Sequence, residues 1–193
     1  MIPTRFNPLG SPPYLRRVAY LGASGTQYIN TGITPGADFT AEITFSVVTG
    51  TNISCGGRQG YTTNEFRITA NGNGQIDFAF GNAAGSYYGQ DFSFFRSVLF
   101  GMDGKLYIDG TLIAERSGTF STFYPFYIFQ FNNGNSSTVG GTGGRISRAI
   151  LKTAGTKVRD LIPVLDKSGV PCMYDRVTNR LFYNAGTGTF NYA

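Results

Sequence analysis

The sequence predicts an all-β fold, and three observations support this prediction. Within residues 38–48 apolar and polar side chains alternate, the period of two that is typical of a strand with one buried face. Two Asp-Gly pairs, Asp103-Gly104 and Asp109-Gly110, separate short apolar runs. The 193 residues include 27 Gly, 17 Phe and 12 Tyr, which favours many strands joined by tight turns. No long helical apolar stripe is present, so helix content should be low.

The segment 97–116 should form a three-stranded antiparallel meander. Asp-Gly between apolar runs indicates tight hairpin turns, because these turns need positive φ angles that Gly and Asp tolerate. In the middle run Leu106 and Ile108 alternate with Lys105 and Tyr107, so one face can join a core.

The remaining elements follow from shorter alternating runs and from turn residues. We expect strands at 18–20, 28–29, 53–56, 65–70, 75–81, 124–131, 145–152, 158–165 and 174–183 and near Phe190. We expect loops at 81–90 and 132–144, which are rich in Gly, Asn and Ser. No fixed-period repeat is present, and 193 residues suit one sandwich or barrel domain, here residues 17–193.

Residues 1–16 should form an extended arm before this domain. The prolines at positions 3, 8, 12 and 13 disfavour a helix or a central strand. The arm would dock on its own domain or on a neighbouring subunit, and its candidate docking residues are Arg5, Phe6, Leu9 and Tyr14. The alternative is a disordered terminus, which is the usual state of such segments.

Composition excludes several functions. Without histidine, the chain cannot form Ser-His-Asp or Cys-His catalytic sites or histidine-based metal sites. Its cysteines, Cys55 and Cys172, are too few for a disulfide framework or a thiolate metal site. Buried thiols on strands are the simplest interpretation, and a single bridge between the two is the alternative. The net charge of +5 fits a mild positive bias or attraction to an acidic partner.

We expect neither a signal segment nor a membrane-spanning segment. The chain does not start with a charged and then apolar stretch, and it has no apolar run of membrane length. It should be made in the cytoplasm.

Three segments resemble a known family: TQYINTGI at 26–33, GKLYIDG at 104–110 and the tail RDLIPVLDKSGVPCMYDRVTNRLFYNAGTGTF at 159–190. They are similar to concanavalin A-like, laminin-G-like jelly-roll modules, most closely those of bacteriophage structural and tail proteins and of gut-bacterial surface proteins. The resemblance covers residues 20–190. It implies a two-sheet antiparallel jelly-roll sandwich, which in many relatives binds carbohydrate on a curved face or at end loops.

The acidic residues do not form a recognisable catalytic or metal site. A glycoside hydrolase on this sandwich would carry clustered acids, and the nearest approach is Asp103, Asp109 and Glu115. The two aspartates are already explained by their Asp-Gly turns. For calcium, the acids Asp38, Asp77 and Asp91 are isolated. We therefore expect no enzyme activity, no cofactor and no metal.

Glycan binding needs an aromatic face and hydrogen-bonding side chains. Tyr87, Tyr88, Asn132, Asn133 and Asn135 supply these residue types in Gly-rich loops. The alternative is that the tyrosines cover core edges and the asparagines form turns.

Nucleic-acid binding is not expected. Counting alternation along 145–152 places Arg145 and Lys152 on opposite faces, so with Arg148 they form no continuous stripe. The run GGTGG at 140–144 lacks the Lys and Ser/Thr of a phosphate-binding loop and precedes a strand.

These observations lead to one expectation and two alternatives. The expectation is a non-enzymatic bacteriophage virion protein, a capsid decoration or a fibre-type head, that is anchored to other virion proteins by its arm and forms homo-oligomers. The first alternative is a lectin module for host glycans. The second, a hydrolase, would depend on Asp109 or Glu115.

Overall fold

A computed structural model describes residues 12–60, 63–118, 124–134 and 137–193 of the chain. Within this part the protein is all-β, apart from one 3-10 turn at Met102–Gly104. The strands are β1 (Tyr14–Arg17), β2 (Leu21–Gly22), β3 (Ile29–Asn30), β4 (Phe39–Val47), β5 (Asn52–Gly60), β6 (Thr63–Asn71), β7 (Ile76–Gly81), β8 (Ala83–Tyr87), β9 (Arg96–Gly101), β10 (Lys105–Ile108), β11 (Thr111–Glu115), β12 (Tyr127–Ile128), β13 (Phe131–Asn133), β14 (Ser137–Val139), β15 (Gly144–Thr153), β16 (Thr156–Asp166), β17 (Pro171–Asp175), β18 (Arg180–Phe182) and β19 (Asn191–Tyr192).

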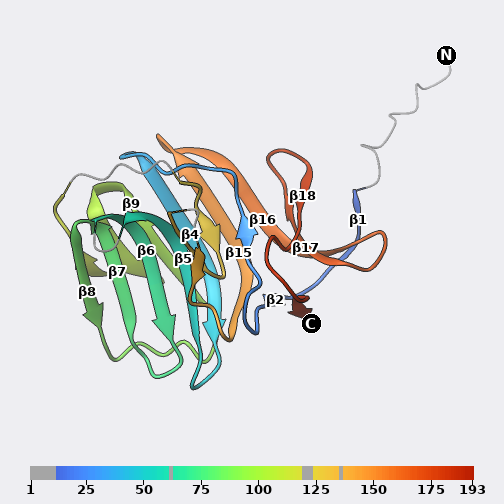
Figure 1. Ribbon diagram of the computed structural model, residues 1–193, viewed down its shortest axis with the longest axis horizontal. Helices are drawn as coiled ribbons and strands as arrows, with labels where there is room; N and C mark the ends of the chain where they lie inside the picture. Colours follow the sequence, from blue (N-terminus) through green and yellow to red (C-terminus); the bar gives the residue numbers. More distant parts are fainter. Residues whose placement is uncertain (1–11, 61–62, 119–123, 135–136) are drawn as a thin grey trace, which may run out of the picture.

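The strands form two sheets. Sheet A has the order β11-β10-β9-β4-β15-β16-β17-β18, with β1 paired to β16 and β2 lying between β15 and β19. Sheet B has the order β14-β13-β5-β6-β7-β8, with β12 paired to β5 and β3 paired to β12. In Figure 1 strands β5 to β8 of sheet B lie at the left, and β15, β16 and β17 of sheet A lie to their right. The pairs are antiparallel except for β13 with β5.

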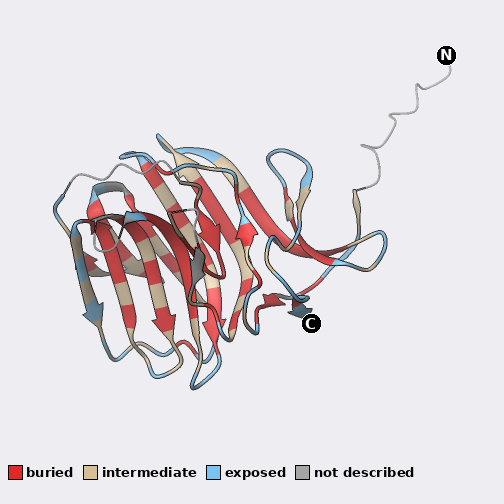
Figure 2. Ribbon diagram, viewed as in Figure 1, coloured by how far each residue is buried: buried red, intermediate tan, exposed pale blue. Residues whose placement is uncertain are grey.

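The core lies between the two sheets. The apolar positions of β4 point inward as predicted, and its polar positions point outward. Phenylalanine rings join the layers: the Phe66 ring of sheet B lies 5.3 Å from Phe39 and 5.1 Å from Phe100 of sheet A, between ring centroids. Figure 2 shows the buried positions concentrated along the central strands. Aromatic contacts of this kind add to the free energy gained by burying the rings.

The predicted meander is confirmed as β9, β10 and β11, which pair in sequence. All four Asp-Gly residues have positive φ angles: Asp103 69°, Gly104 66°, Asp109 48° and Gly110 81°. The two aspartates therefore occupy the turn positions that the sequence predicted.

Several other sequence predictions are wrong. The expected loop 81–90 contains β8, and the expected loop 132–144 contains β14 and most of β13. The expected strand 124–131 is interrupted at Phe129, where φ is 75°, and the expected strand 174–183 is the turn and return of the hairpin β17–β18. Strands β8, β14 and β18 each pair with the strand that precedes them in the chain, and this pairing, which local composition does not report, decides their backbone conformation.

The basic residues of β15 also lie differently from the prediction. A β-bulge between Ile146 and Arg148 inserts one extra residue and shifts the alternation. Arg145 pairs with Ser46 and Lys152 with Thr40, and both of these β4 residues lie on the outer face. Arg145 and Lys152 therefore share the outer face of sheet A, and the prediction of opposite faces is wrong.

Strand β1 attaches the amino end of the described chain to sheet A. Tyr14 pairs with Asp166 of β16, and its ring lies 4.9 Å from that of Tyr174. These rings cover a small second apolar cluster formed by Ile162, Val164 and Cys172. Tyr14 thus packs on its own domain, whereas Arg5, Phe6 and Leu9 lie outside the described residues.

Candidate functional site

The two tyrosines predicted to bind glycans lie at the β8 edge of sheet B. Tyr87 pairs with Ile76 and packs against the core, with the Arg116 guanidinium 5.4 Å from its ring centroid. Tyr88 follows the strand and is 70% exposed. Of the pair, Tyr88 offers the free aromatic face.

Two of the predicted asparagines, Asn132 and Asn133, lie at the other side of sheet B, on β13. Asn132 is fully buried, and its side-chain amide donates to the Pro125 carbonyl oxygen at 3.1 Å. The Asn133 side-chain oxygen accepts a 2.7 Å hydrogen bond from Nε of Arg58, and Asn135 lies outside the described residues. Three strands, β5, β6 and β7, separate β13 from β8, roughly 19 Å at 4.8 Å per strand. The structure therefore does not bring Asn132 and Asn133 together with the tyrosines.

A charged cluster that the sequence reasoning missed lies on the outer face of sheet B. Glu65 has a side chain only 5% exposed and accepts contacts from two arginines: Nη1 of Arg58 lies 3.2 Å from Oε1, and Nε of Arg67 lies 2.7 Å from Oε2. The side chains of Arg58 and Arg67 are 8% and 18% exposed. Burial of charges is tolerated here because each is paired and hydrogen-bonded.

One aromatic ring supports this cluster. The guanidinium carbons of Arg58 and Arg67 lie 5.0 Å and 5.3 Å from the centroid of Phe131, a separation typical of cation–π contacts. Phe131 is on β13, whose parallel pairing with β5 places it beside Gly56. The three strands β13, β5 and β6 thus hold both guanidiniums in fixed positions.

Hydroxyl groups continue the polar row along β5 and β6. Nη1 of Arg67 donates to the Thr69 hydroxyl at 3.4 Å, and the hydroxyls of Thr69 and Ser54 are 2.9 Å apart. The alternation of Phe66, Ile68 and Ala70 with the outward residues of β6 was visible in the sequence. It could have placed Glu65, Arg67 and Thr69 on one face, but it could not place Arg58 beside them.

A pocket of about 200 Å³ opens beside this cluster. Its charged wall is Glu65 and Arg67, and its floor is made of small residues on β7 and β8. Because alanine and glycine carry at most one methyl group, they leave a hollow next to the guanidinium. The lining residues are Glu65, Arg67, Ala79, Gly81, Asn82, Ala83 and Ala84.

A second pocket, of about 250 Å³, lies on the outer face of sheet A between β4, β9 and β10. Leu99 and Tyr107 contribute to its wall together with Lys105 and Asp103. Lys105 pairs at 3.9 Å with Glu115, whose side chain is 63% exposed. Unlike the pocket on sheet B, this one contains no buried charged side chain among the lining residues.

The acids considered for hydrolysis are engaged in turns and surface pairs. Asp109 accepts the Ser97 backbone N–H at 2.8 Å and pairs with Arg96. Burial raises the pKa of the Asp109 carboxyl, but these two contacts outweigh it and lower the pKa overall. The contacts of Asp109 with Ser97 and Arg96 stabilise the β10–β11 turn.

The described residues contain no group of three or more Cys, Asp or Glu side chains that could hold a metal ion. Within the same part of the chain, no helix is long and apolar enough to cross a membrane.

The fold and this site define an all-β protein of two packed sheets with a charged pocket on one outer face. No protein-family model and no curated protein matches the chain.

Proposed function

We propose that the chain is a non-catalytic, carbohydrate-binding jelly-roll module of the concanavalin A-like kind, and that the pocket beside Glu65 and Arg67 is its ligand site. The two-sheet architecture and the three family-like segments support the class. The observation that carries the ligand site is the pocket itself, because it places the buried Glu65 carboxylate and the partly buried Arg67 guanidinium beside a hollow on the outer face of sheet B.

The pocket has the chemistry that a sugar ring requires. The Glu65 carboxylate accepts hydrogen bonds, and the Arg67 guanidinium and the Asn82 amide donate them, which suits vicinal hydroxyl groups. The methyl groups of Ala79 and Ala84 offer an apolar floor to the C–H face of a ring. The volume of about 200 Å³ is below the roughly 300 Å³ at which pockets for drug-sized ligands begin, so the site suits one residue of a glycan.

The arrangement favours binding over hydrolysis. A glycosidase needs two carboxyl groups about 5 to 10 Å apart. Asp77 is the acid on the next strand, four ladder positions from Glu65, which corresponds to roughly 14 Å. Asp77 is also engaged by Gln75 and by the Ser86 hydroxyl, at 2.7 Å and 2.6 Å.

A glycan array, followed by calorimetry on the best ligand, tests the proposal. Ala84 is exposed and lines the pocket, so Ala84→Leu should fill the hollow without disturbing the core and weaken binding at least tenfold. Ala37→Leu is the matched control, because Ala37 is exposed and lies outside the pocket. A silent array, or equal affinity of the two variants, would contradict the proposal. Loss of binding only in Tyr88→Ala would instead place the ligand at the end of β8.

The second proposed role is that of a structural component of a bacteriophage virion, in which the segment before β1 attaches the domain to other virion proteins. It rests on the resemblance to phage modules and on β1, which follows that segment and pairs with β16 of sheet A. Deleting residues 1–13 removes Arg5, Phe6 and Leu9 but keeps the Tyr14–Tyr174 contact. The shortened protein should keep its melting temperature and its self-association, measured by sedimentation, while losing attachment to particles. Unchanged attachment would refute this role.

A further inference from the structure

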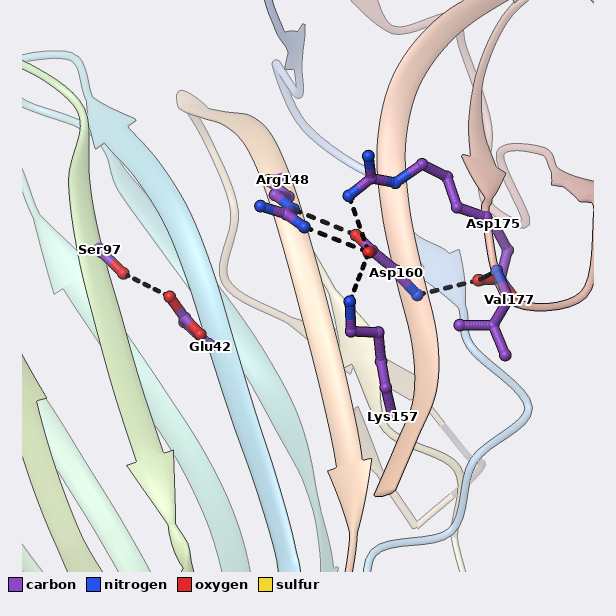
Figure 3. A network of polar contacts seen from close by, with 8 residues as sticks. Glu42, Ser97, Arg148, Lys157, Asp160, Asp175 and Val177 are labelled. Carbon is purple, nitrogen blue, oxygen red and sulfur yellow. Dashed lines mark hydrogen bonds and ion pairs between the residues drawn. The ribbon is translucent and has the colours of Figure 1, made fainter. Parts of the chain in front are cut away.

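The outer face of sheet A carries a cluster of cations around a single carboxylate. Asp160 of β16 has a side chain only 4% exposed and accepts Nε of Arg148 at 3.1 Å, Nζ of Lys157 at 2.9 Å and Nη2 of Arg176 at 2.8 Å. Arg148 contacts it twice, since its Nη2 lies 3.1 Å from Oδ2. Figure 3 shows Arg148 and Lys157 directed at Asp160 from neighbouring strands.

The three cations come from three different segments. Arg148 faces outward because of the β-bulge in β15, Lys157 lies at the start of β16, and Arg176 follows β17. The backbone secures their meeting point, because the Arg176 N–H donates to the Asp160 carbonyl oxygen at 3.0 Å and the Asp160 N–H donates to Asp175 at 2.9 Å. The cluster is therefore fixed by the fold.

Positive charge exceeds negative charge at this cluster. Lys152 pairs in register with Lys157 and adds a fourth cation. The opposing acids are Asp160 and Glu42. Hydrogen bonding to Asp160 is the main reason that the pKa of Arg148 is raised, and Glu42, on β4, is near enough for its charge to contribute. Arg159 and Asp175 lie 3.7 Å apart and offset each other. Four cations against two acids leave an excess of two positive charges.

The cations also keep hydrogen-bonding capacity directed at solvent. The side chains of Arg148, Lys157 and Arg176 are 41%, 42% and 42% exposed, although the carboxylate that they share is buried. Their contacts with Asp160 use Nε and Nη2 of Arg148 and Nη2 of Arg176, so Nη1 of each arginine remains outside these contacts.

We propose that Arg148, Lys157 and Arg176 form a binding site for a tetrahedral oxyanion, namely a sulfate or phosphate ester group. Cations within reach of one carboxylate are close enough to converge on one such group, and guanidinium and ammonium donors are the usual ligands of these anions. Asp160 holds the side chains in place before binding, which reduces the conformational entropy that binding costs. The site is independent of the sugar pocket, because it lies on the opposite outer face of the molecule.

The test is a titration of the full chain with sodium sulfate or sodium phosphate, monitored by the NMR shifts of the backbone amides. Sodium chloride at matched ionic strength is the reference. Saturable shifts at Arg148, Lys157 and Arg176, absent with chloride, are expected. Lys157→Gln and Arg176→Gln should each weaken the affinity about fivefold or more, because each removes one charged hydrogen-bond donor. Lys105→Gln is the control, since Lys105 belongs to the same sheet but pairs with Glu115.

A sulfated disaccharide and a 5′-phosphorylated dinucleotide then distinguish a carbohydrate from a nucleic-acid source of the anion. Both variants keep two cations on Asp160, so their folds, checked by thermal melting, should remain intact. Sulfate and phosphate shifts that match those of chloride, or variants that bind these anions like the parent protein, would overturn the proposal.

Discussion

Replacing Asp175 by alanine should destabilise the protein strongly, although Asp175 lies far from the proposed sugar pocket. Its side chain is fully buried, and Oδ1 accepts the backbone N–H groups of Asp160 at 2.9 Å and Val177 at 3.1 Å. Oδ2 accepts the Thr178 hydroxyl at 2.6 Å and lies 3.7 Å from Nη1 of Arg159. Alanine would leave buried donors unsatisfied and a partly buried guanidinium without its carboxylate, a loss of about 4 kcal/mol.

For a domain of this size, that loss corresponds to a decrease in melting temperature of about 8 to 16 °C. Asp175→Asn is the matched variant, because its amide oxygen can still accept the two backbone N–H groups; it should cost about 1 to 2 kcal/mol. Thermal melting and urea denaturation of the three proteins measure both values. An alanine variant within 1 kcal/mol of the parent, or no difference between alanine and asparagine, would refute the reasoning.

Three further predictions concern pH, the thiols and a glycine. Burial raises the pKa of Asp160, but hydrogen bonds from its three cations outweigh burial and hold that pKa well below the usual 3.8. Its contribution to stability should therefore be complete at neutral pH and should decrease progressively as the pH falls below about 4. The stability difference between the parent and Asp160→Asn in urea should be smaller at about pH 3 than at about pH 7. Burial raises the pKa of Cys55 and Cys172 to about 12, so iodoacetamide should modify both thiols only after unfolding. Gly56→Ala should lower the free energy of unfolding by at least about 3 kcal/mol, because φ is 136° and the new Cβ would overlap a carbonyl oxygen of β6. Gly155→Ala is the control, because φ is 74° but no atom lies near the new Cβ; it should lower that free energy by about 1 kcal/mol. Thermal melting measures both values.

Opposite outcomes would contradict each of these in turn. An Asp160→Asn difference that is the same at both pH values would mean that the three cations do not lower the pKa of the carboxyl. Rapid alkylation of either cysteine in the folded protein would mean that its thiol is accessible. Equal losses of stability for the two glycine substitutions would mean that backbone strain alone, and not the clash with β6, destabilises the Gly56→Ala variant.

The proposed sugar pocket could be predicted only in part. Alternation along β6 places Glu65 and Arg67 on one face, because the two-residue period of a strand is local. The partner Arg58 reaches them through the β5–β6 register, and Phe131 reaches them through the parallel pairing of β13. The floor of the pocket depends on β8, whose Ala, Gly and Ser residues resemble a loop in the sequence.

The sequence by itself determined the all-β class, the inward face of β4 and the two Asp-Gly turns at positive φ, since each depends on neighbouring residues and on backbone sterics. Only the tertiary structure decided which outward side chains meet. A single β-bulge after Ile146 brings Arg145, Arg148 and Lys152 onto one face, and the registers of β15 with β16 and of β16 with β17 gather three cations around Asp160. Contacts of this kind depend on the register between paired strands, which is set by burial of the core. The alternation along a single strand does not report that register.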